Sequence, residues 1–346
     1  MLKIALIAPP HIAVPPANYG GTELFVAQLA EGLQKAGAQV IVYANAESTV
    51  NVERRSLYKQ SQWPIKNSEH ALIRATNHES WAIQDAAKEC DIIHVQSAHA
   101  LTFSRFVDKP TVLTLHGPHD PKLSELYAHF PDIYYVGISN SQIKSETMPR
   151  IRTIYHGINP SQYTFREQKQ HYLSFIGRLA LAKGTHLAID VARETGIPLK
   201  IAGDVQPVNR EYFEKKIQPQ IDGQLVEYVG TADFKTKNEL LSSSLAMLFP
   251  IQWREPFGLV MVEAMACGTP VLAYPGGSVP EIVRDGISGY ICRNVQQMVE
   301  RVSNLDLNPA AVRHYVEENF SIDRMVNSYL ELYEDALRES RTQKVA

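Results

Sequence analysis

Residues 3–44, KIALIAPPHIAVPPANYGGTELFVAQLAEGLQKAGAQVIVYA, carry the signature of a strand, a helix and a second strand. Short runs rich in β-branched residues lie at both ends of the stretch. Between them Phe25, Leu29 and Leu33 recur every four residues, which places them on one face of a helix. Such a unit forms a right-handed crossover between parallel strands. The stretch therefore predicts a parallel sheet covered by helices.

The same alternation continues along the chain and restarts in its second half. The expected strands are apolar throughout, as strands buried on both faces of a parallel sheet are, and helical stretches separate them. In the first half they are Lys3–Ala8, Gln39–Ala44, Asp91–Gln96, Thr111–His116 and Ile133–Ser139. In the second half they are Tyr172–Gly177, Leu199–Gly203, Leu225–Gly230, Ala246–Pro250 and Pro270–Tyr274.

Two further segments complete the predicted organisation. Tyr155–Gln170 is polar and has no period, so it is interpreted as a linker. A long final helix is expected from Asp323 to about residue 341, with an apolar stripe. The stripe consists of Met325, Tyr329, Leu332, Tyr333 and Ala336. We predict an α/β fold of two doubly wound, Rossmann-like domains facing a central cleft, which suits a chain of 346 residues.

Composition narrows the class of protein. The 34 Lys and Arg residues against 37 Asp and Glu give a net charge of -3, without the basic excess that nucleic-acid binding needs. The three cysteines form no CxxC pair, so neither a disulfide framework nor a zinc site is indicated. No apolar run approaches a membrane span, and Pro9 and Pro10 interrupt the N-terminal one, which is interpreted as a strand rather than a signal peptide. A cytoplasmic protein is expected.

In doubly wound sheets, ligands bind beyond the carboxyl ends of the strands, so the loops that leave those ends are the candidate sites. The first ends in Gly20-Gly21-Thr22 before a helix, where backbone N–H groups favour an anion. Its alternative interpretation is a tight turn with Thr22 as the N-cap. The chain contains neither GxG nor GxxxxGK[ST], which excludes a dinucleotide fingerprint and a P-loop.

A second loop, Gly177–Gly184, carries Arg178 and Lys183. A guanidinium fork and a compact ammonium both suit clustered phosphate oxygens. Two basic residues in a loop are also compatible with simple solvation. Their position at the carboxyl end of a strand favours the phosphate interpretation.

A third loop, within Arg254–Gly289, places Glu255 and Glu263 eight residues apart. Pro256 keeps Glu255 out of the helical region, and Glu263 falls in the first turns of the helix that follows. Two carboxylates around a helix N-terminus suit a ligand with hydroxyl pairs at both ends and a phosphate between them. A carboxylate that merely complements the helix dipole would explain neither Glu255 nor the Pro-Phe-Gly after it. The backbone amides able to close onto a bound oxygen are those of Phe257, Gly258 and Leu259.

The stretches EPFGLVMVEAMACGTPV and GGSVPEIV, followed by DG and SG, resemble the signature of the retaining family 4 glycosyltransferases, which have the GT-B fold. The E-x7-E element is the specific part of this resemblance. Shorter and less specific motifs extend the resemblance over nearly the whole chain. They are GGTE, TLHG, SNS, GR…KG, IAGD and YVGTAD. The resemblance implies an acceptor-side domain of residues 1–157, on which a C-terminal helix of about 321–346 packs back. It implies a nucleotide-sugar domain of residues 158–320.

Position by position, the resemblance also implies roles. Glu255, with the amides of Phe257, Gly258 and Leu259, would hold the hydroxyls of the donor sugar, and Glu263 would bind the ribose. Arg178 and Lys183 would neutralise the diphosphate, which the Gly20-Gly21 backbone would also meet. Thr231 and Ala232 would contact the base through their backbone, and His116 would lie near the reacting centre. The expected catalytic set is His116, Glu255, Arg178 and Lys183.

These roles predict a retaining hexosyltransferase that uses a nucleotide diphosphate sugar, expected to be UDP-linked, and a hydroxyl acceptor. No Asp-x-Asp motif is present, so we expect neither a metal nor another cofactor, and Arg178 and Lys183 supply the positive charge. Acceptor contacts are expected in the first domain, from Tyr19, His99 and His119. A sugar or small alcohol is favoured over a membrane lipid because no basic amphipathic helix is apparent in that domain.

Three alternatives stay open. The same fold could serve a nucleotide-sugar epimerase, against which the E-x7-E spacing speaks. A nucleotide-sugar-binding protein without catalysis is a second, although every charged position expected of an active site is present. An NAD-dependent dehydrogenase is disfavoured by the missing glycine fingerprint. The acceptor, the sugar transferred and the oligomeric state are not encoded in any recognisable motif.

Overall fold

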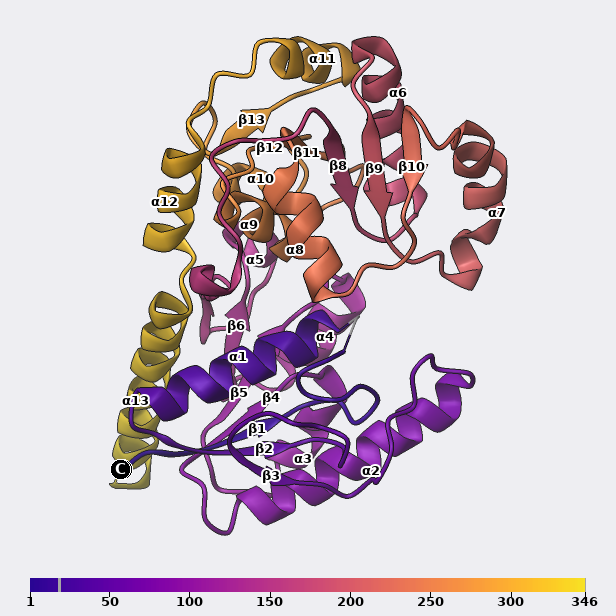
Figure 1. The fold of residues 1–346 in the computed structure, drawn as a ribbon. Coiled ribbons are helices and arrows are strands. Elements are labelled where there is room, and N and C mark those ends of the chain that lie inside the picture. The colour runs from indigo at the N-terminus through magenta and orange to yellow at the C-terminus, as the bar shows by residue number, and fades with distance from the viewer. Residues whose placement is uncertain (18–19, 346) are drawn as a thin grey trace. The chain divides into compact units, whose positions relative to one another are not determined.

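The computed structural model describes residues 1–17 and 20–345, and the side chains through residue 342 (Figure 1). The chain forms two compact units. Unit 1 comprises Met1–Gly157 together with Ile322–Ala346, and unit 2 comprises Ile158–Ser321. Each unit is an α/β domain built on its own parallel sheet, so the predicted fold class is confirmed.

Unit 1 is built on a seven-stranded sheet in the order β3-β2-β1-β4-β5-β6-β7, in which all neighbours are parallel. The order reverses beside β1, which pairs with both β2 and β4. In such sheets this switch point is where ligands bind. The strands are β1 (Lys3–Ile7), β2 (Gln39–Tyr43), β3 (Glu53–Arg55), β4 (Ile92–Val95), β5 (Thr111–Leu115), β6 (Tyr134–Gly137) and β7 (Ile151–Thr153).

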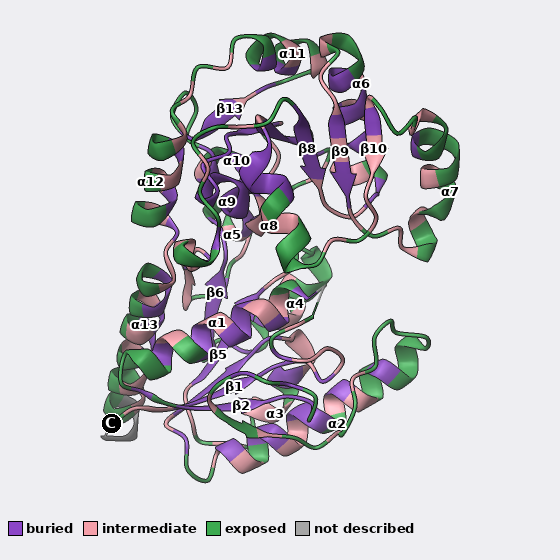
Figure 2. Cartoon of the chain, viewed as in Figure 1, coloured by how far each residue is buried: buried purple, intermediate pink, exposed green. Residues whose placement is uncertain are grey.

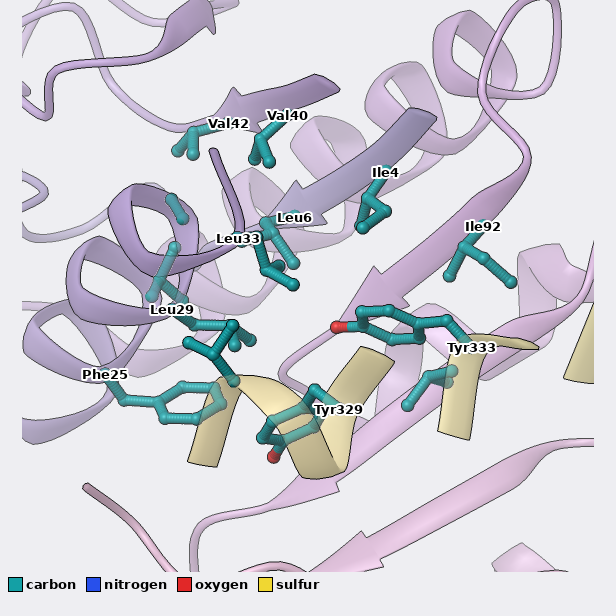
Figure 3. Packing of buried hydrophobic residues seen from close by; sticks show 14 of the residues in the cluster. Ile4, Leu6, Phe25, Leu29, Leu33, Val40, Val42, Ile92, Tyr329 and Tyr333 are labelled. Atoms are coloured by element: carbon teal, nitrogen blue, oxygen red, sulfur yellow. The ribbon is translucent and has the colours of Figure 1, made fainter. Parts of the chain in front are cut away.

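Helices cover both faces of this sheet. On one face α1 buries Phe25, Leu29 and Leu33 against the strands, as the four-residue spacing predicts. The C-terminal helix α13 packs beside α1 and inserts Tyr329 and Tyr333 into the same cluster (Figure 3). The helices of unit 1 are α1 (Gly21–Lys35), α2 (Ser68–Ala86), α3 (Leu101–Ser104), α4 (Pro121–Ala128), α5 (Asn140–Ile143) and α13 (Ile322–Val345).

The C-terminal helix belongs to unit 1 although it follows unit 2 in the sequence. Its predicted apolar stripe is buried throughout, because Met325, Tyr329, Leu332, Tyr333 and Ala336 all pack into the core of unit 1. Two hydrogen bonds anchor it to the sheet. The hydroxyl of Tyr333 lies 2.8 Å from Nδ1 of His94, and that of Tyr329 lies 2.9 Å from Oγ1 of Thr114.

Unit 2 repeats the same topology on a six-stranded parallel sheet in the order β10-β9-β8-β11-β12-β13. Its strands are largely buried, whereas its outer helices expose one side (Figure 2). The strands are β8 (Leu173–Ile176), β9 (Leu199–Ala202), β10 (Val226–Tyr228), β11 (Ala246–Phe249), β12 (Val271–Ala273) and β13 (Gly289–Ile291). The helices are α6 (Thr185–Thr195), α7 (Arg210–Tyr212), α8 (Phe234–Ser243), α9 (Leu259–Ala266), α10 (Val279–Ile282), α11 (Val295–Ser303) and α12 (Pro309–Asn319).

The structure corrects the prediction in two places. Strands β3, β7 and β13 were not predicted. The first two contain charged side chains (ERR and IRT) and the third begins with a glycine (GYI), so none of them resembles an apolar strand in the sequence. Tyr155–Gln170 is not a free linker: from Ile158 onward it packs on unit 2, where Tyr163 is buried. There the ammonium of Lys169 donates to two backbone carbonyls and to Thr269, each at 2.9 Å.

Among the helices of the described residues, none combines the length and the apolar composition needed to cross a lipid bilayer.

Candidate functional site

The candidate site of unit 2 lies at the switch point of its sheet, where β8 and β11 are neighbours. The loop after β8 carries Arg178 and leads through Lys183 to the start of α6. The loop after β11 carries Glu255 and leads to the start of α9. Adjacent parallel strands end at the same edge of a sheet, so these two loops meet there.

Glu255 is held by a tightly closed loop. Gly258 caps α9 with a φ of 81°, and a Cβ there would come within 2.7 Å of Cε of Met261. Ser278 fixes the other side, because its N–H donates to the carbonyl of Glu255 (2.9 Å) and its hydroxyl donates to that of Phe257 (2.8 Å). A Cβ on Gly277 would lie 2.2 Å from the carbonyl oxygen of Glu255. The glycines of this segment therefore permit a backbone approach that other residues would block.

Lys183 and Glu255, predicted to serve one ligand, are in direct contact. Nζ of Lys183 lies 2.5 Å from Oε2 of Glu255, and the two side chains are only 13% and 9% exposed. The indole N–H of Trp253 donates to the same oxygen at 2.8 Å. The ammonium also lies 4.8 Å from the centre of the Trp253 ring. Glu255 is thus a buried carboxylate with one oxygen occupied and the other, Oε1, without a hydrogen bond to any described residue.

Glu263, on α9, has partners of its own. The hydroxyl of Tyr163 donates to Oε1 of Glu263 at 3.1 Å, and Lys237 on α8 forms a short ion pair with the same atom. Burial, followed by the charge of Glu263, raises the pKa of Tyr163 far above its usual range, so this phenol remains a donor. Sequence reasoning missed Tyr163, Lys237 and Trp253. The first two are distant in sequence from the motif, whereas Trp253 stands two residues before Glu255.

Arg178 differs from the other charged residues of this site. Its side chain is partly exposed and has no hydrogen bond or ion pair with another residue in the described part of the chain. The guanidinium is therefore available to a ligand.

Thr231 and Ala232 lie in the loop between β10 and α8, where Thr231 is exposed and Asp233 caps the helix.

Unit 1 contains the second predicted set, at the carboxyl ends of β1 and β5. Helix α1 begins directly after Gly20. The φ of this residue is 148°, a value that glycine adopts readily and other residues rarely adopt. Gly20 is the capping residue, so the alternative with Thr22 as the N-cap is wrong. Tyr19 lies outside the described residues.

Glu23 stands in the first turn of α1 beneath this loop. A Cβ on Gly20 would lie 2.8 Å from its Oε2, so the carboxyl group and the glycine loop are tightly packed. Burial raises the pKa of Glu23 to about 7. An unfolded glutamate titrates near 4.5, so the folded state binds the extra proton between about pH 4.5 and 7.

We expect Glu23→Gln to flatten the pH dependence of stability. Because the pKa of Glu23 is higher in the folded than in the unfolded state, its ionisation leaves the free energy of unfolding unchanged below about pH 4.5. As the pH rises toward 7, ionisation of Glu23 progressively lowers that free energy. The difference between the folded and unfolded pKa values of Glu23 corresponds to roughly 3 kcal/mol at pH 8. Denaturant unfolding at pH 5 to 8 should show the variant gaining stability relative to the parent as the pH rises. Glu31→Gln, on the exposed side of α1, is the control, and equal pH slopes for the parent and Glu23→Gln would contradict the assignment.

His116 directly follows β5 and lies in a cluster of aromatic rings. Its Nε2 lies 2.8 Å from Oε1 of Gln96, which can only accept, so Nε2 carries the hydrogen. The ring stacks on His156 at 15° and meets the edge of Phe25. Burial lowers the pKa of His116 to about 3, so the imidazole is neutral at physiological pH. Gln96, which fixes this tautomer, was not singled out from the sequence.

The two histidines predicted for the acceptor each pair with a buried glutamate. Nδ1 of His119 lies 2.7 Å from Oε1 of Glu146, whose other oxygen accepts from Ser124 at 2.7 Å. Nε2 of His99 lies 3.0 Å from Oε2 of Glu79. The predicted residues therefore divide between the units: Gly20, Gly21, His99, His116 and His119 belong to unit 1, and Arg178, Lys183, Thr231, Ala232, Glu255, Phe257, Gly258, Leu259 and Glu263 belong to unit 2.

Two family models match the chain, one in each part. The model described as "Glycosyltransferase Family 4" matches residues 19–162, and the model described as "Glycosyl transferases group 1" matches residues 161–321. Among curated relatives, glycogen synthase of Mycobacterium tuberculosis is 28% identical over 279 residues, covering 70% of this chain and 67% of the relative. Two other curated relatives are matched over only 45% and 30% of their own length.

Solved structures support the same fold. Sucrose-phosphate synthase from Thermosynechococcus elongatus superposes with a TM-score of 0.80 at 18% identity, covering 98% of this chain and all of that one. Anabaena HepE, crystallised with UDP and glucose, superposes with a TM-score of 0.76 at 19% identity, covering 96% of this chain and 100% of its own. At such low identities these likenesses establish the fold. Together with the two family models, they show that the chain belongs to the family 4 glycosyltransferases and has the GT-B fold.

Proposed function

We propose that this protein is a retaining glycosyltransferase that moves a hexosyl unit from a UDP-sugar to a hydroxyl acceptor without a metal ion. The observation that carries the proposal is the contact between Lys183 and Glu255 at the start of α9, with the guanidinium of Arg178, which pairs with no described residue, in the neighbouring loop. A ligand that carries both hydroxyls and a diphosphate suits a carboxylate and two cations at one sheet edge.

The reaction breaks the bond between the anomeric carbon and the diphosphate oxygen, and the electron pair leaves with UDP. Fixed positive charge near that oxygen is the largest stabilising effect available. Arg178 and Lys183 supply it, while Glu255 and the amides of Phe257 to Leu259 hold the sugar. The acceptor oxygen bonds to the anomeric carbon from the same face, and its proton passes to a phosphate oxygen of the leaving group.

Glu263 is proposed to bind the ribose of the nucleotide. Its carboxylate is already oriented by Tyr163 and Lys237, and only Oε1 is engaged by them. The backbone of Thr231 and Ala232 is proposed to meet the base. In unit 1, the Gly20-Gly21 backbone is proposed to donate to the diphosphate and the neutral imidazole of His116 to contact the sugar or the acceptor.

The comparisons support a UDP-linked donor. HepE was crystallised with UDP-glucose as well as with UDP and glucose. We also propose that the enzyme is cytoplasmic, because its three cysteines are buried and free, as is usual in a reducing compartment.

A thermal-shift series with UDP, GDP, ADP and NAD tests the donor class. A true ligand raises the melting temperature with its concentration by mass action. We expect UDP to stabilise the protein and NAD to have no effect. Incubation with UDP-glucose without an acceptor should release glucose and UDP slowly. Stabilisation by NAD alone would contradict the proposal, and formation of an epimeric UDP-sugar would favour the epimerase instead.

If transfer needs no metal ion, removal of divalent ions should not affect the activity. Because Arg178 and Lys183 carry the charge that a divalent ion would supply elsewhere, we expect exhaustive EDTA treatment to leave the transfer rate within about two-fold of its starting value. The rate of UDP release, with and without added MnCl₂, is the measurement. An enzyme inactivated by EDTA and restored by manganese would contradict this.

A further inference from the structure

A cavity of about 400 Å³ lies in unit 1, at the opposite edge of the sheet from the predicted acceptor residues. It is lined by residues from the stretches 104–111 and 129–134, by Arg150, and by Ser340 of α13. These stretches lead into the amino ends of β5 and β6, and Arg150 directly precedes β7, whereas His116 follows the carboxyl end of β5. Strand β5 has 5 residues, so the two edges are roughly 16 Å apart. We call this space the amino-edge cavity.

The amino-edge cavity has the size and the hydroxyl groups to hold a small polar molecule. Pockets that bind small ligands have volumes of roughly 300–1,000 Å³. The hydroxyl of Ser104 donates to the carbonyl of Leu101 at 2.6 Å, and that of Thr111 donates to the carbonyl of Lys109 at 3.2 Å. A hydroxyl that donates in this way can still accept, so both oxygens are able to receive hydrogen bonds from hydroxyls of a ligand.

Two guanidinium groups of the lining are supported by aromatic rings. The guanidinium carbon of Arg105 lies 4.3 Å from the centre of the Phe130 ring, and that of Arg150 lies 4.9 Å from the centre of the Tyr134 ring. Both rings are buried, so they provide a fixed support. A guanidinium that stacks through its face keeps the N–H groups at its edge for hydrogen bonds, in a planar arrangement that matches phosphate oxygens.

The acidic side chains of the lining neutralise these cations only in part. The charged lining residues are Arg105, Lys109 and Arg150 against Asp108 and Asp132. Asp108 is exposed, and the side chain of Asp132 is 86% exposed, so both carboxylates are largely hydrated. Arg150 donates to the carbonyl of Asp132 at 3.1 Å.

Two of the three cations have no partner in the described part of the chain. The side chains of Arg105 and Lys109 form neither a hydrogen bond nor an ion pair with another described residue. Arg150 differs, because its Nε lies 3.6 Å from a carboxylate oxygen of Glu339, outside the lining. The charge available to a ligand is therefore that of Arg105 and Lys109.

The number of free charges selects the class of anion. A phosphomonoester carries about 1.5 to 2 negative charges near pH 7, which matches two unpaired cations, whereas a single carboxylate carries one. A lone phosphate ion would leave most of the cavity unfilled. The hydroxyl oxygens of Ser104 and Thr111 suit a phosphate that is attached to a hydroxyl-bearing body.

We propose that the amino-edge cavity binds a phosphomonoester whose body carries hydroxyl groups. Arg105 and Lys109 hold the phosphate, and the edge of the Arg150 guanidinium donates to it from the third side. The hydroxyl oxygens of Ser104 and Thr111 accept from the body. The site goes beyond the proposed sugar transfer, because it contains none of the residues assigned to that reaction.

Calorimetric titration of the full-length protein tests the class of ligand. The probes are glucose 6-phosphate and AMP, which have a sugar and a nucleoside as the body, and succinate as a dicarboxylate of similar charge. At least one of the two phosphomonoesters should bind, and the tighter of them identifies the body. Failure of both to bind, or tighter binding of succinate, would overturn the proposal.

Variants then locate the bound phosphate. Arg105→Gln and Lys109→Gln should each weaken binding of that phosphomonoester by roughly ten-fold or more, as expected for the loss of a charged hydrogen bond. Neither side chain has a described partner, so both variants should fold and melt as the parent does. Arg54→Gln, which changes an exposed arginine on β3, is the matched control and should bind as the parent does.

The variant Arg178→Ala separates this cavity from the diphosphate site proposed in unit 2. A phosphomonoester in the amino-edge cavity should bind equally to Arg178→Ala and to the parent. Loss of binding in Arg178→Ala, with unchanged binding in Arg105→Gln and Lys109→Gln, would place the phosphate in unit 2 and overturn the proposal.

Discussion

Replacing Arg178 with alanine is expected to lower kcat for sugar transfer by roughly 10²–10³, the effect typical of losing one oriented group that stabilises transition-state charge. The guanidinium has no hydrogen bond or ion pair with another described residue, so its removal leaves no buried group unsatisfied. The melting temperature should therefore change little while the rate falls. Steady-state kinetics with UDP-glucose and a responsive acceptor measure the effect.

The control for this variant is Arg301→Ala. Arg301 lies on α11 in the same unit and stacks over the ring of Tyr290 at 4.4 Å, away from the loops after β8 and β11. It should keep nearly full activity. Comparable rates for the two variants would show that Arg178 does not act on the leaving group.

The second large effect is expected for Glu255→Gln. The amide keeps the shape of the side chain but removes the charge that pairs with Lys183, and it replaces an acceptor of sugar hydroxyls with a donor on one side. We expect kcat/KM for the UDP-sugar to fall by roughly 10²-fold, at the upper end of the range for hydrogen bonds to charged groups. UDP binding should change much less than UDP-sugar binding, because Glu255 holds the sugar and reaches the diphosphate only through its partner Lys183.

Calorimetric titration of UDP beside kinetics with UDP-glucose separates these two outcomes. Glu227→Gln is a matched control, since Glu227 also pairs with a lysine in unit 2 but at 3.8 Å and in an exposed position. An equal loss of UDP and UDP-sugar binding by Glu255→Gln would mean that the whole loop had collapsed. Retention of full kcat/KM would remove Glu255 from the sugar site.

The fold was largely predictable because the strands and helices of a parallel sheet produce short sequence patterns that repeat along the chain. Apolar strands and the four-residue spacing of Phe25, Leu29 and Leu33 are both periodic over a short window, and the structure has them as β1, α1 and β2. β3 and β7 were missed because they contain charged side chains, and β13 because it begins with a glycine. Unit 2 begins at Ile158, inside a polar segment, and the segment packs on this unit through two buried side chains, Ile158 and Tyr163, that form no periodic pattern.

The candidate site was predictable only where its residues follow one another in the chain. The segment from Glu255 to Glu263 was found because a proline, a glycine and two carboxylates stand at fixed spacing. Lys237 and Tyr163 orient Glu263 from positions 26 and 100 residues away, and no local sequence pattern distinguishes them from other lysines and tyrosines. The same holds for Gln96 and Glu79, whose burial emerges only when α2 packs on the sheet.

A crystal structure with a hydrolysis-resistant UDP-glucose analogue would show whether the edge of unit 2 beside β8 and β11 binds an activated sugar. We expect pyrophosphate oxygens on the guanidinium of Arg178 and sugar hydroxyls on Glu255. An analogue bound elsewhere, or both side chains pointing away from it into solvent, would rule out this site.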